Sequence, residues 1–348
     1  MMRMQKILKK ARHHPRNVFL ISVLCGIGLV IGSWGGGIPL GYAAEAFPSG
    51  KITWIVGFQP GGGEDIMARG IAPYLEKYLK AVSPNPGKVA ILIKNLPGGG
   101  EVRAINDIYH AKPDGYTIGN GGERLHILTM TGELPFDFYE ISYIARLASS
   151  HKILVATKKS NFSIWDDVVK ASKSAPVKLA LSGFGGSNYI AFVFFVDTTG
   201  LALKPVIFDG TAGANSALIR GDVPISINSE DSLKTLIDYN ELRPLLTFTD
   251  QTKFPGVPTI KEIGFPELIE PVRSQRYLIG PPGLPGNIKR IYEDALKKVF
   301  ADKEFLAWNE KAKVTYNPVF GSDFDNLIKT IQGFYKKKEK VLRENLPK

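Results

Sequence analysis

The sequence predicts an α/β protein with two lobes, each built on a mostly parallel sheet flanked by helices. Short apolar stretches are repeatedly followed by a glycine-rich loop and then by apolar residues at helical spacing, which is the order expected of parallel sheets. The chain has 348 residues, enough for two hydrophobic cores of ordinary size. Its hydrophobic content of 44% and charged content of 22% are typical of a globular protein.

The first strand–loop–helix unit spans residues 51–79. Alternating apolar residues over 52–58 predict a half-buried strand, and three glycines follow in the loop 59–64. Asp65 is expected to cap the next helix, which Pro73 would kink. Glycines allow close approach of a ligand, and a helix N-terminus offers unpaired N–H groups, so this unit predicts an anion site, interpreted as a carboxylate site. The alternative is a plain tight turn.

The following residues continue the same pattern through the first part of the first lobe. The expected elements are a buried strand at 89–93, a glycine turn at 95–100, a helix at 102–109, a short strand at 116–118 and a second glycine loop at 119–123. Residues 141–148 and 152–157 are expected to form one long strand or two, which lead into the second lobe. We place a crossing between lobes close to the polar residues 149–151.

Another set of strands and helices forms the second lobe. The expected elements are strands at 178–181, 206–208, 224–227 and 242–248, a third glycine loop at 182–187, helices at 189–196 and 211–220, and a short helix ending at Gly264. The segment 189–196 is rich in strand-forming residues, but its place between a glycine loop and Gly200, a helix C-cap, favours a buried helix. A strand at 276–279 and helices at 288–300, 303–313 and from 324 onward complete the chain.

These elements predict that one domain is inserted within another. We assign residues 47–147 and 272–348 to the first lobe and residues 148–271 to the second. A chain that crosses twice between lobes is typical of a binding protein that closes about a hinge.

Residues 1–46 have the features of a secretory signal peptide. A basic region ends at Arg16, an apolar run spans 18–31, and small residues precede expected cleavage after Ala43 or Ala46. The alternative, a retained anchor, is disfavoured because the run is shorter than the ~20 residues that span a bilayer. Removing the segment takes six basic residues and one acid from the net charge of +11, which leaves +6, and removes Cys25, the only cysteine. We therefore expect a periplasmic protein without disulfides.

The sequence lacks the patterns of catalytic, metal and nucleic-acid sites. No histidine of the expected mature chain has a second ligand at metal-binding spacing, and no glycine loop has the spacing of a P-loop, a dinucleotide site or a serine nucleophile elbow. No basic stripe interleaved with aromatic residues is present. We expect no catalytic residue, no cofactor, no metal and no nucleic-acid partner. An exported α/β hydrolase or transferase using Ser187 is the alternative, although that serine lacks an evident base.

Nine motifs, in order and spread over nearly all of the expected mature chain, resemble the extracytoplasmic solute receptors of tripartite tricarboxylate transporters, the Bug family. The motifs are residues 58–65 (FQPGGGED), 95–100 (NLPGGG), 112–117 (KPDGYT), 134–137 (LPFD), 182–187 (SGFGGS), 208–210 (FDG), 221–223 (GDV), 257–259 (VPT) and 281–285 (PPGLP).

The resemblance implies a two-lobed, type II periplasmic binding protein with its ligand cleft between the lobes. Such a protein would close on a small organic acid, deliver it to integral-membrane permease subunits and act as a monomer. A receptor that presents its ligand to a periplasmic signalling domain is the alternative.

The resemblance also assigns ligand-binding residues by position. In the first lobe these are Phe58, Gly61, Gly62, Gly63, Asp65, Gly121, Gly122 and Glu123. In the second lobe they are Ser182, Gly185, Gly186, Ser187, Asp209, Gly210, Thr211 and Asn228. Backbone N–H groups of the first glycine loop would hold one carboxylate, whereas Asp65 has an alternative structural role as a cap and partner of Arg69.

Three acidic residues depart from the pattern of this family. Glu64, Glu123 and Asp209 stand where small or basic residues are usual, and acids in the cleft would disfavour a dianion. Our hypothesis is that the ligand is a monocarboxylate, or carries a cationic or polar tail, rather than citrate. The alternative is that these side chains point to solvent.

Overall fold

The computed structural model describes residues 46–131, 136–312 and 314–346. The predicted signal peptide, apart from Ala46, lies outside the described residues, as do Leu134 and Pro135 of the LPFD motif and the last residue of the helix expected at 303–313.

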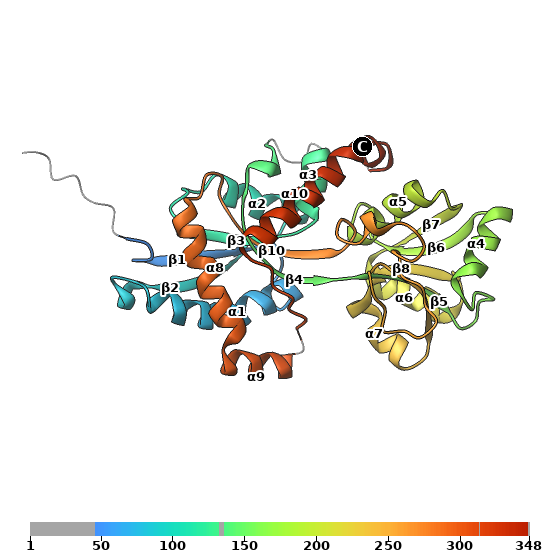
Figure 1. The fold of residues 1–348 in the computed structure, drawn as a ribbon, viewed down its shortest axis with the longest axis horizontal. Coiled ribbons are helices and arrows are strands. Elements are labelled where there is room, and N and C mark those ends of the chain that lie inside the picture. Colours follow the sequence, from blue (N-terminus) through green and yellow to red (C-terminus); the bar gives the residue numbers. More distant parts are fainter. Residues whose placement is uncertain (1–45, 132–135, 313, 347–348) are drawn as a thin grey trace, which may run out of the picture. The chain divides into compact units, whose positions relative to one another are not determined.

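The first lobe is built on a five-stranded sheet with strand order β2-β1-β3-β10-β4 (Figure 1). Its elements are β1 (Lys51–Val56), α1 (Gly63–Lys80), β2 (Ala90–Asn95), α2 (Val102–Tyr109), β3 (Thr117–Gly121), α3 (Arg124–Thr131), β4 (Ser142–Ser150), β10 (Ser274–Gly280), α8 (Gly286–Ala301) and α9 (Lys303–Ala312). Strand β1 pairs in parallel with β2 and β3, and only β10 runs against its neighbours.

The second lobe repeats this plan with the strand order β7-β6-β8-β5-β9. Its elements are β5 (Lys152–Thr157), α4 (Trp165–Ser174), β6 (Val177–Ser182), α5 (Ser187–Thr199), β7 (Leu203–Phe208), α6 (Gly210–Arg220), β8 (Ile225–Ser229), α7 (Glu230–Asp238) and β9 (Leu242–Thr247). Only β5 runs against its neighbours. The predicted pair of mostly parallel sheets flanked by helices is confirmed.

Two adjacent strands carry the chain between the sheets (Figure 1). Strand β4 belongs to the first sheet up to Ser150, and β5 enters the second sheet at Lys152. The chain returns in β10, which pairs with β4 from Ser274 opposite Ser150 to Gly280 opposite Ser142. The outgoing connection after Ser150 and the start of the returning strand at Ser274 therefore lie side by side, at the end of the β4–β10 pair that faces the second lobe.

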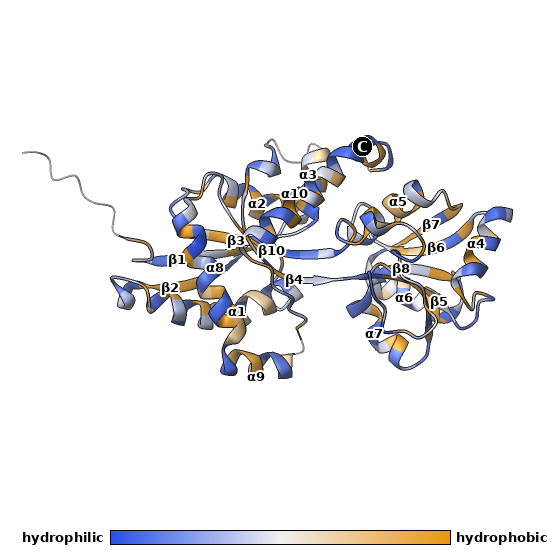
Figure 2. Cartoon of the chain, viewed as in Figure 1, coloured by the Kyte–Doolittle hydropathy of each residue, from blue (hydrophilic) through white to orange (hydrophobic). Residues whose placement is uncertain are grey.

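Helices cover both faces of the first sheet. Ile52, Trp54 and Val56 of β1 pack with α1 and α8 on one face, whereas Ile55 packs with α2 on the other. The helices α1 and α8 show alternating apolar and polar stripes, as expected for helices with one face on a core (Figure 2). The predicted half-buried strand is thus an inner strand with both faces covered.

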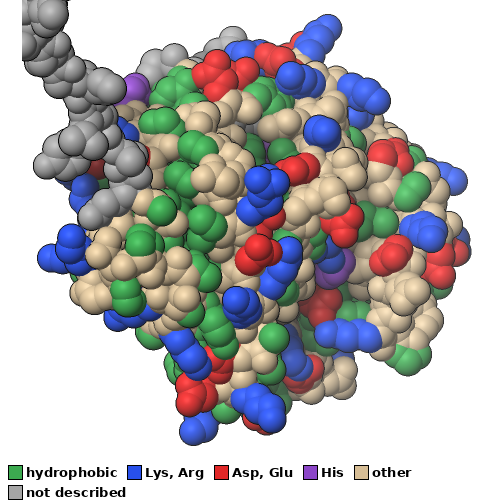
Figure 3. Space-filling view, turned by 60° about the vertical axis from the view of Figure 1, so that its left-hand side comes forward, with side chains coloured by type: hydrophobic (Ala, Val, Ile, Leu, Met, Phe, Trp, Pro, Cys, Tyr) green, Lys and Arg blue, Asp and Glu red, His purple; other side chains and the backbone are tan. Residues whose placement is uncertain are grey.

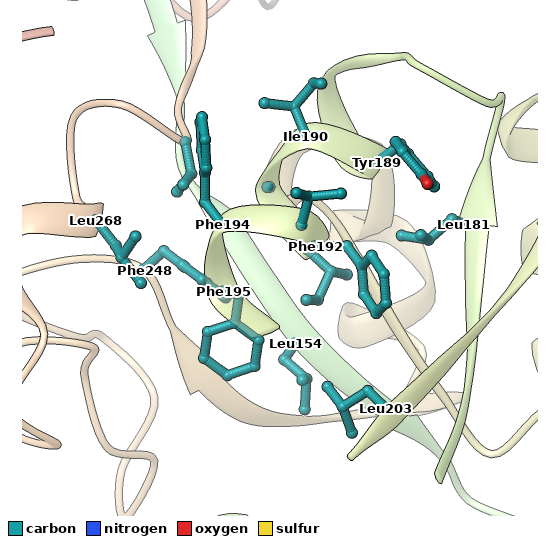
Figure 4. Close-up of a cluster of buried hydrophobic side chains, with 14 of the residues drawn as sticks. Leu154, Leu181, Tyr189, Ile190, Phe192, Phe194, Phe195, Leu203, Phe248 and Leu268 are labelled. Atoms are coloured by element: carbon teal, nitrogen blue, oxygen red, sulfur yellow. The ribbon is translucent and has the colours of Figure 1, made fainter. Parts of the chain in front are cut away.

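The core of the second lobe is organised around α5. Its residues 188–195 are all buried, and the aromatic side chains Phe192, Phe194 and Phe195 project in different directions into the surrounding cluster (Figure 4). A helix that is apolar all round belongs in the interior, where packing overrides the strand propensity of its residues. The expected helix at 189–196 and its C-cap, Gly200, are confirmed.

The last two helices, α10 (Gly321–Lys337) and α11 (Glu339–Asn345), contribute to the cores of both lobes. Phe324 of α10 packs in the first lobe, whereas Tyr335 and Leu342 join the cluster around α5. The hydroxyl of Tyr189 on α5 also donates to the backbone oxygen of Asn345 at 2.8 Å. The second lobe therefore takes part of its core from residues that we assigned to the first.

Several sequence-based expectations about individual elements are wrong. The expected buried strand at 89–93 is the edge strand β2, in which Leu92 is 50% exposed. The expected glycine loop at 119–123 is occupied up to Gly121 by β3, which pairs with β10. The expected short helix ending at Gly264 is a series of turns.

The predicted start of the first helix is also wrong. Gly62, not Asp65, is the N-cap, and α1 continues without interruption through Pro73. Asp65 lies in the first turn, and its carboxylate accepts a hydrogen bond from the Gly61 N–H at 2.9 Å, so it fixes the loop from inside the helix.

Candidate functional site

A buried lysine gathers polar groups from three other parts of the chain. Lys152, the first residue of β5, is 1% exposed. Its Nζ atom lies 2.6 Å from Ser187 Oγ, 2.7 Å from Ser274 Oγ, 2.8 Å from Asn188 Oδ1 and 3.2 Å from Ser229 Oγ, so its three N–H groups are shared among four acceptor oxygens. These partners come from the start of α5, the end of β8 and the start of β10. We call Lys152 and these four residues the Lys152 cluster.

The positive charge of the Lys152 cluster has no carboxylate partner among the described residues. Among the described residues, no carboxylate lies within 4.0 Å of the ammonium group, since no ion pair includes it. Burial lowers the pKa of Lys152 to about 8, with the Glu123 carboxylate acting in the opposite direction. The ammonium group is therefore protonated at neutral pH and has only neutral oxygens as partners.

The hydroxyl groups of the cluster are suited to donate to an anion. An oxygen that accepts from an ammonium group retains its own proton for another acceptor. Two contacts between hydroxyls occur, Ser187 to Ser274 at 3.3 Å and Ser229 to Ser274 at 2.8 Å. These two contacts use at most two of the three hydroxyl protons, so at least one remains for a ligand or water. All three serines are partly exposed.

The N-terminus of α5 adds backbone donors beside the Lys152 cluster. The loop before it takes left-handed backbone angles at Gly183 (φ 72°) and Gly185 (φ 71°), which glycine adopts readily. The helix begins at Ser187, and the first helical hydrogen bond is from Ile190 N to Gly186 O. The preceding N–H groups have no helical partner and carry the partial positive charge of the helix.

Two predicted second-lobe residues position Asn188 rather than contact Lys152. The Asn188 Nδ2 atom donates to Ser182 Oγ at 2.8 Å and to Asn228 Oδ1 at 2.7 Å. These bonds use both amide protons and orient Oδ1 toward Lys152. Ser182 and Asn228 thus support the site from behind.

The other predicted second-lobe loop, 209–211, lies at the same end of the sheet. Gly183 N donates to Phe208 O at 3.0 Å, which brings the two loops side by side. Asp209 is the N-cap of α6 and is exposed, as is Gly210. Among the described residues, no hydrogen bond joins Asp209, Gly210 or Thr211 to the Lys152 cluster.

In the first lobe, Asp65 shapes the glycine loop and is already fully engaged. Its carboxylate accepts from Gly61 N, from Arg69 Nε at 2.9 Å and from Asn95 Nδ2 at 2.8 Å. These bonds lower the pKa of Asp65 to about 2, with Arg69 contributing most. The interpretation of Asp65 as a structural residue accounts for all of these contacts.

The loop itself leaves room for a ligand. A Cβ atom placed on Gly61 would meet nothing within 4 Å, and one on Gly62 would meet only the Gln59 backbone oxygen at 3.4 Å. Gly63 begins α1, whose first helical bond is from Ile66 N to Gly62 O, so the N–H groups of Gly63 and Glu64 lack helical partners. Phe58, in the same loop, is 40% exposed.

Gly121 and Gly122 have a packing role. A Cβ atom on Gly122 would lie 2.5 Å from the backbone oxygen of Gln275, and one on Gly121 would lie 2.9 Å from Leu125 Cδ1 and 3.0 Å from Ile279 Cδ1. The close approach to the Gln275 backbone therefore requires glycine at Gly122, whereas the atoms next to Gly121 are the ends of side chains.

Two acidic residues that we singled out are anchored to the returning strand β10. Glu64 accepts from Arg276 Nε at 2.7 Å through Oε1 and from Asn120 Nδ2 at 2.7 Å through Oε2. Glu123 accepts the backbone N–H of Gln275 at 2.7 Å through Oε2. Neither side chain points freely into solvent, in contrast to Asp209.

A third acidic residue, Glu101, was not predicted. It is 9% exposed, has the left-handed backbone angle φ 79° and has no hydrogen-bond partner among the described residues. Burial and the neighbouring Glu64 and Glu123 carboxylates raise the pKa of Glu101 to about 8. The first lobe thus has three glutamates, from three separate segments of the chain, of which Glu64 and Glu123 act electrostatically on Glu101.

Three consecutive residues of β10 connect the charged groups of both lobes. Ser274 contacts Lys152, the N–H of Gln275 contacts Glu123, and Arg276 pairs with Glu64. Both Glu123 and Arg276 influence the pKa of Lys152. A cationic cluster in the second lobe and an acidic cluster in the first therefore belong to one site beside the strands that join the lobes.

Sequence reasoning missed Lys152, Asn188, Ser229, Ser274 and Glu101. A lysine at the head of a strand that was expected to be apolar was the one available signal. The serines and Glu101 gain their role only from long-range packing.

Other classes of site are not found in the described part of the chain. No group of three or more histidine, cysteine or acidic side chains there could hold a metal ion. No described helix is both long and apolar enough to cross a membrane. Lysine and arginine side chains are interspersed with acidic ones on the face shown in Figure 3, without a continuous basic patch.

Comparisons with known proteins identify similar chains. A sequence model of the family described as tripartite tricarboxylate transporter family receptor matches residues 74–346. Protein BugT of Bordetella pertussis is 27% identical over 255 residues, which cover 71% of this chain and 75% of that protein.

Two solved structures share the fold at 21% sequence identity. A TctC solute binding protein from Polaromonas, without ligand, has a TM-score of 0.74 and covers 86% of this chain and 99% of its own. The R. palustris protein Rpa4515, solved with adipate, has a TM-score of 0.64 and covers 85% of this chain and 98% of its own.

Proposed function

Because this chain belongs to the tripartite tricarboxylate transporter receptor family, we propose that it captures a small organic carboxylate between its lobes and delivers it to integral-membrane permease subunits. The family is one of periplasmic solute-binding proteins rather than enzymes, and the expected signal peptide agrees with export to the periplasm.

The observation that carries this proposal is the Lys152 cluster at the N-terminus of α5. It combines a buried positive charge, serine O–H groups and unpaired backbone N–H groups in one place. A carboxylate offers about four acceptor sites, which matches several convergent donors. Hydrogen bonds that involve a charged group contribute roughly 1.5–3 kcal/mol each.

The first glycine loop supplies a second set of donors in the other lobe. These donors are the N–H groups of Gly63 and Glu64 at the start of α1, because the Gly61 N–H donates to Asp65 and the Gly62 N–H donates to the Gln59 backbone oxygen. No protein atom fills the space beside Gly61. A ligand that contacts both loops would favour the closed arrangement of the lobes, because only that arrangement makes both sets of contacts. The adjacent strands β4 and β10 are the natural place for the hinge.

The carboxylate class is also supported by a relative of known structure. The R. palustris protein with the same fold was solved with adipate, a carboxylate. Delivery to a permease rests on the family, whose receptors work with tripartite transporters. Neighbouring genes for a permease or for a signalling kinase would distinguish transport from ligand-dependent sensing.

The contact between Lys152 and Ser187 argues against the alternative of a serine hydrolase. A general base must be deprotonated to accept the serine proton. The three N–H groups of Lys152 are shared among four oxygens, three of them serine hydroxyls, and are not directed at Ser187 alone. The pair therefore favours binding of an anion over activation of a nucleophile.

Calorimetric titration of the exported protein tests this proposal. Mono-, di- and tricarboxylates and amino acids are titrated in parallel, and at least one small carboxylate should bind. Ser187→Ala should weaken that binding. Failure of every carboxylate to bind would contradict the proposal.

A further inference from the structure

We infer that Arg276 is a specificity-determining residue of this site, whose guanidinium group donates to an oxygen atom at the second end of the ligand, opposite the carboxylate held at the Lys152 cluster. This inference rests on the proposed function and adds a side chain of the first lobe to the same site. It follows from four observations: the unused donors of Arg276, the way its guanidinium group is held, its place beside the first glycine loop, and its place beside the Lys152 cluster.

Arg276 has hydrogen-bond donors that the protein does not use. An arginine side chain has five N–H groups. The Nε atom of Arg276 donates to Glu64 Oε1 at 2.7 Å, and in the described part of the chain neither Nη atom has a hydrogen-bond partner. The side chain is 32% exposed, so part of it is open to a ligand. Structural pairs of arginine and carboxylate are frequently bidentate, whereas this pair does not occupy the Nη groups, which suit an oxygen-bearing ligand.

The guanidinium group is held in place from the core of the first lobe. Glu64 Oε2 accepts from Asn120 Nδ2 at 2.7 Å, and Asn120 Oδ1 accepts from Trp54 Nε1 at 2.6 Å. Trp54 is 0% exposed and belongs to strand β1. A donor that is fixed before the ligand arrives loses less entropy on binding, so this chain of hydrogen bonds prepares Arg276 for recognition.

Arg276 lies beside the first residue of α1. A Cβ atom placed on Gly63 would lie 3.9 Å from Arg276 Nη2. The N–H group of Gly63 has no helical partner, and no protein atom fills the space beside Gly61. A ligand group that enters the first glycine loop therefore meets the guanidinium group of Arg276.

Arg276 also lies beside the Lys152 cluster. Side chains two residues apart in a strand point to the same face, and β10 pairs regularly with β4 from Ser274 to Arg276. Ser274 Oγ lies 2.7 Å from Lys152 Nζ, so the cluster and Arg276 share this face of β10. Burial lowers the pKa of Lys152, and the charge of Arg276 contributes in the same direction, as expected for a nearby cation. One small ligand can therefore contact both groups.

Matched ligands test the inference in the wild-type protein. The full exported chain is titrated calorimetrically with butanoate, 4-hydroxybutanoate and succinate, and with hexanoate, 6-hydroxyhexanoate and adipate. At least one ligand with a second oxygen-bearing group should bind about tenfold or more tightly than the alkyl acid of equal carbon number, as expected for one hydrogen bond to a charged group.

Two results would overturn the inference and leave the proposed function intact. The first is equal or tighter binding of both alkyl acids. The second is a tightest ligand in the wider carboxylate screen that has no second oxygen-bearing group. Failure of every carboxylate to bind would contradict the proposed function as well.

Variants then assign the preference to Arg276. Removing Arg276 alone would leave Glu64 without its cation, so the double variant Arg276→Gln with Glu64→Gln replaces both charges. It should reduce the preference for the oxygen-bearing ligand over its matched alkyl acid by about tenfold. Arg276→Lys keeps the ion pair but lacks the Nη groups, and it should show the same loss.

Two further variants serve as controls. Glu64→Gln alone retains the guanidinium group and should keep the preference. Arg290→Gln, at an exposed position of α8, should leave it unchanged. Circular dichroism verifies that each variant is folded. An unchanged preference in either folded variant of Arg276, or equal loss in Glu64→Gln, would overturn the inference.

Discussion

The Nζ atom of Lys152 lies 2.6 Å from the Oγ atom of Ser187, which joins the first residue of strand β5 to the first residue of helix α5. The same ammonium group contacts Ser274 at the start of the returning strand β10. A single side chain therefore places the positive charge of the second lobe beside the strands that connect the lobes.

Lys152→Met should weaken carboxylate binding without unfolding the protein. The variant removes the charge behind the serine hydroxyls but keeps a side chain of similar length, so we expect a loss of about 10- to 100-fold in affinity. Calorimetry with the tightest ligand measures the loss, and circular dichroism verifies folding. Lys178→Met, at an exposed position of β6, is the matched control. Affinity equal to that of the wild type would exclude Lys152 from the site.

Stability should depend on pH through Lys152. Burial lowers the pKa of this lysine from 10.5 to about 8, so between these values the unfolded chain binds more protons than the native one. The contribution of Lys152 to the free energy of unfolding should therefore rise between pH 8 and 10.5. Urea unfolding of wild type and Lys152→Met across this range measures it. A constant difference between the two proteins would contradict the assigned environment of Lys152.

Glu101 should have the opposite signature at lower pH. Its pKa is raised from 4.5 to about 8, so between these values the native state binds more protons than the unfolded state, and its stabilising contribution is lost as pH rises. Glu101→Gln should therefore gain in stability relative to wild type from pH 4.5 to pH 8. Unfolding by urea at several pH values detects this trend, and Glu267→Gln should show none.

Two glycines of the first lobe should respond differently to substitution. Gly62→Leu should abolish ligand binding while the protein remains folded, because φ is −74° and the nearest atom to a Cβ is 3.4 Å away. Gly122→Leu should destabilise the fold, because its Cβ would lie 2.5 Å from the Gln275 backbone oxygen. Thermal unfolding and calorimetry on both variants separate the two effects. Normal binding by Gly62→Leu would remove that loop from the site.

The C-terminal helix should be needed for the stability of the second lobe. Leu342 of α11 is 0% exposed within the core around α5. Leu342→Ala should lower the free energy of unfolding by about 2–5 kcal/mol, as for other large-to-small core substitutions. Lys340→Ala on the exposed side of α11, where the lysine side chain is 87% exposed, is the control. Equal stability of the two variants would show that α11 does not complete this core.

Local sequence patterns predicted the elements whose structure depends on nearby residues. The strand–glycine–helix units at β1 and β6 were evident because glycine and apolar spacing act over a few residues. Gly200 correctly indicated that residues 189–196 form a helix despite their strand propensity. The first strand's burial on both faces was not predictable, since it depends on helices α8 and α2 that lie far away in the sequence.

The site was less predictable than the fold because its contacts are long-range. Ser187 was identified by its loop, but its partners Lys152 and Ser274 are separated from it by 35 and 87 residues. Glu101 is an ordinary acidic residue in the sequence, and only burial beside Glu64 and Glu123 gives it an unusual pKa. Asp65 was correctly considered as a partner of Arg69, whereas its expected place as N-cap was wrong by the three residues that separate it from Gly62.

A crystal structure of the exported protein with its tightest-binding small acid tests the central proposal most directly. We predict a carboxylate oxygen within hydrogen-bonding distance of the Ser187 or Ser274 hydroxyl, with the other end of the ligand facing the first-lobe loop that contains Gly62. A ligand bound to one lobe only, or bound away from the Lys152 cluster, would contradict it.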